Sequence, residues 1–154
     1  MPWTVTVRTN RINQVQASLT DRNKETVRKS AKFMRDVAAS IAPVDTGSFA
    51  ASIYVNGPDG ESDYELRASA ARNLNARAVI IPEIREAQAT SFGSLRNNLG
   101  QFSLPEAIVA SAVEHSVFLE DGTKFMAPQP TFRPAAAATS QVFERDMRTI
   151  ADGV

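Results

Sequence analysis

The strongest constraint on the fold is a long amphipathic segment that ends at a proline. Apolar side chains recur in it at steps of three or four residues: Val27, Ala31, Met34, Ala38 and Ile41. This spacing is that of one face of an α-helix. Pro43 lacks the amide hydrogen that a continuing helix needs, and it disfavours helical backbone at Ala42. We therefore predict a helix with one buried face that stops near Ala42.

The start of this helix is less sharply marked than its end. Thr20 is a candidate N-cap, and Asp21 after it suits the positive end of the helix dipole. The segment 13–19 is compatible with a helix as well. Both starting points are open from the sequence.

A second helix is predicted at the C-terminal end, opened by Pro134, since proline is well tolerated in a first helical turn. Its apolar residues lie near one face: Ala135, Ala136, Phe143, Met147 and Ile150.

Between the helices the pattern favours short strands. Ser52–Val55 and Tyr64–Ala68 flank the polar stretch 56–60, which predicts a β-hairpin. A β-rich run follows at Ala76–Ile81, and Glu106–Glu114 is apolar enough to be a strand or a short helix. Residues 1–11 add an N-terminal strand, because Trp3–Arg8 alternates apolar and polar side chains.

This order of elements predicts an α+β fold in one domain over residues 1–154. A chain of 154 residues is of common single-domain size. We expect the long N-terminal helix and the C-terminal helix to pack on one face of a largely antiparallel sheet.

Residues 83–104 contain too few apolar side chains for a core element, and we interpret them as an extended loop or arm. A long loop inside a compact domain is more often functional than idle. Its large apolar side chains are candidates for contact with a neighbouring subunit, with packing inside the chain as the alternative. They are Phe92, Leu95, Leu99 and Phe102.

Composition narrows the classes of function. Seventeen basic and seventeen acidic side chains cancel, which disfavours general affinity for nucleic acid. The chain has no cysteine, so disulfides, thiolate nucleophiles and most structural zinc sites are excluded, and a reducing compartment is expected. No apolar run approaches the roughly 20 residues that span a bilayer, and no segment directs export.

Two stretches carry a resemblance to a known family. The first is Ala42-Pro43-Val44-Asp45-Thr46-Gly47-Ser48-Phe49-Ala50-Ala51-Ser52-Ile53, after the long helix. It resembles a pattern of the tail-component family of long-tailed bacteriophages, whose members are described as neck, tail-completion or minor tail proteins. The second lies between His115 and Ala135: Phe118-Leu119-Glu120-Asp121-Gly122-Thr123, then Ala127-Pro128-Gln129-Pro130-Thr131-Phe132-Arg133-Pro134-Ala135. It is similar to two consecutive patterns of the same family, in the same order and spacing.

The resemblance implies a structural subunit of the virion that acts by shape and contact, without catalysis, cofactor or metal. It implies a ring, with a hexamer as the first expectation and a dodecamer as the alternative. The ring would stand at the head-to-tail junction or the tail end and join connector, terminator or tail-tube proteins, after assembly in the host cytoplasm. The motif residues then serve as structural positions: Pro43, Asp45, Thr46, Gly47, Glu120, Gly122, Thr123, Pro130, Phe132 and Pro134.

Three other functions remain open. A basic stripe on the long helix could line a lumen that DNA crosses, or could be an ordinary solvated face; it comprises Arg22, Lys24, Arg28, Lys29, Lys32 and Arg35. His115 with Ser116 could serve a small hydrolase, although no nucleophile motif is present. His115 with Glu114, Glu120 and Asp121 could bind a divalent cation, but no known ligand spacing appears.

Overall fold

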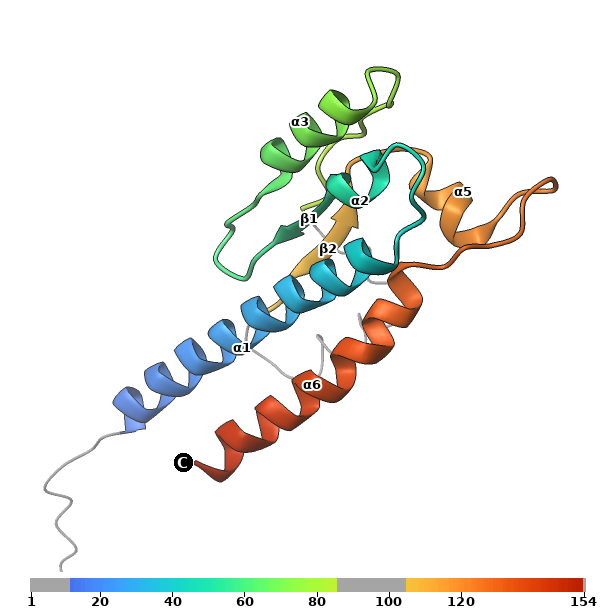
Figure 1. The fold of residues 1–154 in the computed structure, drawn as a ribbon. Helices are drawn as coiled ribbons and strands as arrows, with labels where there is room; N and C mark the ends of the chain where they lie inside the picture. The colour runs from blue at the N-terminus through green and yellow to red at the C-terminus, as the bar shows by residue number, and fades with distance from the viewer. Residues whose placement is uncertain (1–11, 86–104, 154) are drawn as a thin grey trace, which may run out of the picture.

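A computed structural model describes residues 12–85 and 105–153. Two long helices, α1 (Ile12–Ile41) and α6 (Phe132–Asp152), pack against each other, and α1 also contacts a two-stranded sheet of β1 (Ile53–Asn56) and β2 (Ile108–Ser111) (Figure 1). Three shorter helices complete the chain: α2 (Ser48–Ser52), α3 (Tyr64–Leu74) and α5 (Ser116–Asp121). The predicted strand at 3–8 and the four apolar arm residues lie outside the described residues.

The α+β prediction is confirmed. β1 and β2 are antiparallel, with Ile53 opposite Ser111 and Asn56 opposite Ile108. The N-terminal and C-terminal helices pack together, and α3 lies on the other side of the sheet from α1 (Figure 1). The two named strands are fewer than the predicted set, because helix α3 replaces the expected strand at Tyr64–Ala68 and the run at Ala76–Ile81 forms only an isolated bridge.

Helix α1 stops at Ile41, as the proline at position 43 predicts. It begins at Ile12, so the earlier of the two open starting points is confirmed and Thr20 is not an N-cap. No glycine or proline interrupts residues 12–20, and glutamine, alanine and leucine there favour helical backbone. The helix therefore continues through the threonine.

The predicted hairpin strand at Tyr64–Ala68 is wrong, because this segment is the first part of α3. Tyr64, Ala68 and Ala71 follow helical steps, and the two alanines are buried. Only one residue pair of the expected hairpin forms, an isolated bridge between Asn56 and Ser62. The Asp63 carboxylate then accepts a hydrogen bond from the Val55 amide at 2.7 Å, which ties the start of α3 to β1.

The β-rich run at Ala76–Ile81 forms only a single antiparallel bridge, between Ile80 and Val113. The Ile81 amide donates to the Ala112 carbonyl at 2.8 Å, and the Glu114 amide donates to the Val79 carbonyl at 3.0 Å. Within Glu106–Glu114 the strand alternative holds, as β2. The backbone of 79–81 thus extends the pairing beyond the end of β2.

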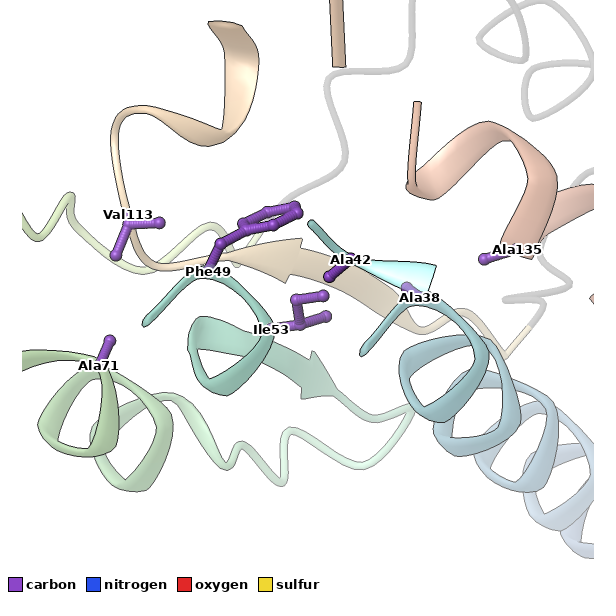
Figure 2. Close-up of a cluster of buried hydrophobic side chains, with 7 residues drawn as sticks. All are labelled: Ala38, Ala42, Phe49, Ile53, Ala71, Val113 and Ala135. Carbon is purple, nitrogen blue, oxygen red and sulfur yellow. The ribbon is translucent and has the colours of Figure 1, made fainter. Parts of the chain in front are cut away.

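The core is small and built largely from alanine. Figure 2 shows side chains from α1, α2, α3, α6 and the sheet region pointing into one cluster. Small side chains let the helices approach closely, whereas larger ones there would force them apart. The cluster comprises Ala38, Ala42, Phe49, Ile53, Ala71, Val113 and Ala135.

Candidate functional site

The two stretches that carry the family resemblance meet in space through Phe49. Its ring lies edge-to-face with Phe132, at a centroid distance of 6.2 Å, and with His115, at 6.4 Å. Phe49 is only 4% exposed. Edge-to-face packing of aromatic rings adds about 0.5–1.5 kcal/mol beyond burial of their area. One aromatic side chain therefore joins α2 to both ends of the second stretch.

In the first stretch the conformation of the connector depends on Gly47. Its φ of 75° lies in the left-handed region, which glycine adopts without strain. The Gly47 carbonyl accepts the Ala51 amide at 3.0 Å, and the Thr46 hydroxyl accepts the Ser48 amide at 3.3 Å. Residues 42–47 thus form a tight connector, and the short helix α2, which was not predicted from the sequence, follows it directly.

In the second stretch Glu120 caps helix α6. Its carboxylate accepts hydrogen bonds from the backbone amides of Thr131 at 2.6 Å, Phe132 at 3.0 Å and Arg133 at 3.1 Å. These are amides that a helix leaves without partners at its start. Partial burial opposes ionisation of this carboxyl, but the three amides and the Arg133 guanidinium outweigh that effect and lower the pKa of Glu120.

Helix α6 begins at Phe132, two residues before the predicted start. Pro134 lies in the first turn, where its missing amide hydrogen costs no helical hydrogen bond. Thr131 is fully buried beside the cap, and Pro130 before it is exposed. Phe132 and Ala135 then turn inward, onto Phe49 and into the alanine core.

Gly122 opens a projecting turn between α5 and α6. Its φ is 75°, and a Cβ at this position would lie 2.8 Å from both the Met126 carbonyl oxygen and the Pro128 nitrogen. Thr123 and Met126 exchange two backbone hydrogen bonds, of 2.9 and 3.2 Å. Residues 122–130 form an excursion that projects beyond α5 (Figure 1). We call it the 122–130 loop.

A cavity of about 230 Å³ lies between the connector after α1 and helix α5. It brings four predicted motif residues together with side chains that the sequence analysis did not connect to them. Its lining consists of Pro43, Asp45, Thr46, Gly47, Phe49, Asn75, His115 and Leu119. Small-molecule sites usually enclose roughly 300–1,000 Å³, so this cavity is closer to the size of one side chain.

Two of the three predicted acidic partners of His115 have other contacts. Glu120 is committed to α6, and Asp121 accepts a hydrogen bond from Arg133 at 2.8 Å. Ser116 is buried in the first turn of α5. Among residues 12–85 and 105–153, no group of three or more His, Asp or Glu side chains is arranged to hold a metal ion.

Three of the six residues of the basic stripe of α1 pair with acids from the loop before α3. Lys24 and Arg28 form ion pairs with Asp59 at 2.5 and 2.8 Å, and Arg35 pairs with Asp63 at 3.1 Å. Arg28 also contacts Glu61 and Glu25, which raise its pKa. These pairs were not predictable from the sequence, because the acids lie 28–35 residues away along the chain.

Four exposed apolar side chains that were not predicted lie on α5 and on the segments beside it. Val117 and Phe118 lie on α5, Phe125 lies in the 122–130 loop, and Val44 lies in the connector beside the cavity. Phe125 is 87% exposed and Val44 is 90% exposed. We call these four side chains the α5-end surface. The available sequence signal was Phe125, which follows the Asp121-Gly122 turn by three residues.

Comparison with protein families, with characterised proteins and with solved structures gave no match. In the described part of the chain, no helix has the length and apolar character needed to cross a bilayer.

Proposed function

We propose that this chain is a structural subunit of a phage virion that forms a ring at the head-to-tail junction or at the tail end. Its partners are copies of itself, six in the first expectation, together with connector, terminator or tail-tube proteins. The proposal assigns it no reaction and no cofactor. Its location is the neck or tail of the particle, after assembly in the bacterial cytoplasm.

The observation that carries the proposal is the α5-end surface. Val44, Val117, Phe118 and Phe125 are exposed on α5 and on the two segments beside it, whereas the core of the protein is mostly alanine. Burying one such side chain is worth about 1.5–3 kcal/mol, so covering several of them favours association. Large apolar side chains exposed on neighbouring segments favour an interaction at this end of the molecule.

The roles of the motif residues also support a contact protein. Glu120, Gly122 and Gly47 hold the connector, the 122–130 loop and the start of α6 in fixed positions around the α5-end surface. They act on the backbone and on helix ends. The resemblance to neck and tail-completion proteins supplies the virion context.

The test is the mass of the purified protein by light scattering and native mass spectrometry, alone and mixed with a tail-tube or connector protein. We expect a closed oligomer of defined copy number, alone or only with the partner. A matched variant, Phe118→Ser with Val117→Ser, should shift the mass toward the monomer, whereas Glu144→Ser on the exposed side of α6 should leave it unchanged.

A DNA shift assay at moderate salt tests the alternative of a DNA-contacting module. Binding that depends steeply on salt would favour that alternative, because release of counterions from the phosphate backbone gives such a slope. A persistent monomer that ignores its partners and binds DNA would refute the ring proposal.

A further inference from the structure

The 122–130 loop presents an aromatic side chain to water from a well-fixed turn. The bridge between Thr123 and Met126 closes the turn, and the Phe125 amide donates to the Thr123 hydroxyl at 3.2 Å. The Gln129 amide donates to the Leu119 carbonyl at 2.8 Å, and this bond ties the end of the loop to α5. Phe125 nevertheless remains 87% exposed.

The same turn carries an uncompensated positive charge. The Lys124 ammonium lies 4.7 Å from the centre of the Phe125 ring, a cation-π arrangement. Within the described residues Lys124 has no carboxylate partner. Lys124 and Phe125, which we call the tip, therefore present an apolar ring with a cation beside it.

The cavity on the other side of α5 has the complementary chemistry. Phe49 and Leu119 supply apolar wall, and Asp45 supplies an exposed carboxylate. Asp45 has no cation partner among the residues that the structure describes. Val44, the most exposed of the large apolar side chains, adjoins this rim.

The tip and the cavity lie on different sides of α5. The cavity is walled by the connector, α2 and α5, whereas the 122–130 loop projects from α5 away from α2 (Figure 1). The tip does not fill the cavity of its own chain, since Phe125 is exposed. A projection on one side and a socket on another permit head-to-tail contact, which generates rings when the rotation closes.

We infer that the Lys124–Phe125 tip of one copy inserts into the cavity of the next copy, with Lys124 paired to Asp45 of that neighbour. The occupant is thus a second copy of this chain. The inference rests on the proposed function, because it names the contact that would join the subunits of the ring. Burial of Phe125 supplies affinity, and the charge pair supplies orientation.

Disulfide trapping tests this contact directly, because the chain has no cysteine of its own. Copies carrying Lys124→Cys are mixed with copies carrying Asp45→Cys and oxidised. We expect a covalent dimer that forms faster than in a mixture of Lys124→Cys with Glu144→Cys, whose thiol is on an exposed turn of α6. Equal rates in the two mixtures would overturn the inference.

Replacing Phe125 and exchanging the charges of Lys124 and Asp45 give an independent test in solution. Phe125→Ser should weaken self-association about thirtyfold or more, the range of an interface hot spot, while the melting temperature of the monomer stays unchanged. Lys124→Asp or Asp45→Lys should each weaken association, and the double variant should restore it. Failure of the double variant to restore it would contradict the predicted pair.

The outcomes separate this inference from the ring proposal. A defined oligomer that survives Phe125→Ser and shows no preferential trapping refutes the tip-and-cavity contact but leaves a ring built through another surface. A wild-type chain that stays monomeric, with and without partners, and shows no preferential trapping refutes both. Preferential trapping with loss of oligomer in Phe125→Ser supports both.

Discussion

The Glu120 carboxylate accepts hydrogen bonds from the first backbone amides of α6, which have no acceptor within the helix. Removing it leaves three backbone amides near the buried Thr131 without acceptors. We predict that Glu120→Ala lowers the free energy of unfolding by about 1–2 kcal/mol, the upper part of the range for lost N-caps. Chemical denaturation at pH 7 measures it.

The neighbouring acid provides the control. Asp121 is 58% exposed and pairs with Arg133 at the surface, and exposed ion pairs contribute about 0–1 kcal/mol. Asp121→Ala should therefore cost clearly less than Glu120→Ala. Equal losses would mean that Glu120 acts as an ordinary surface charge.

Gly122 and Gly60 both have a positive φ, but Gly122 also has a ψ of −179°, a conformation essentially limited to glycine. Both have φ near 80°, but a Cβ at Gly122 meets backbone atoms at 2.8 Å, whereas at Gly60 nothing lies within 4 Å. Gly60→Ala should cost only the left-handed backbone term, about 1–2 kcal/mol. Gly122→Ala should cost more and displace the 122–130 loop, as thermal unfolding and proteolysis of that loop would report. A smaller loss at Gly122 than at Gly60 would contradict this account.

At the scale of elements, the contact between α1 and α6 depends on small side chains. Ala135 is fully buried in the alanine cluster, whereas Ala138 on the same helix is exposed. We predict that Ala135→Leu destabilises the fold by about 1–3 kcal/mol through overpacking, and that Ala138→Leu changes stability little. Urea denaturation of the two variants measures the difference. Similar changes in the free energy of unfolding for the two variants would mean that α1 and α6 can move apart without cost.

At the scale of the whole molecule, acid should destabilise the fold. Folding lowers the pKa of Glu25, Asp59, Glu61, Glu83 and Glu120. A carboxyl with a lowered pKa in the folded state contributes stability above its ordinary pKa, which is 4.5 for Glu and 3.8 for Asp. This contribution is lost as the pH falls through the lowered values.

We therefore expect the urea midpoint to be nearly constant from pH 7 to about 5 and to fall steeply below pH 4. Glu120→Gln should flatten part of this fall, because glutamine does not titrate. A midpoint that rises on acidification would contradict the assignment of these carboxylates as stabilising.

Much of the helical framework was predictable because its signals are local. Pro43 ends α1 through its own ring and missing amide hydrogen. The apolar spacing of α1 marks a face on which Ala31 and Ala38 are buried, although Ile41 at its end is 44% exposed. The strand at Tyr64–Ala68 was wrong because a five-residue window does not distinguish a half-buried strand from the first turns of α3. The following alanines, with their helical spacing, decide between them.

The α+β class, the end of α1 and a C-terminal helix near Pro134 were predictable from the sequence, because they depend on local apolar spacing and on single prolines, whereas α2, α3 and α5 were not predicted. That Glu120 caps α6, that acids near α3 pair with basic residues of α1, and that Phe49 joins the two motif stretches follows only from the folded arrangement. The physical reason is distance along the chain: a hydrogen bond, an ion pair or a ring contact between remote residues exists only once packing has brought them together.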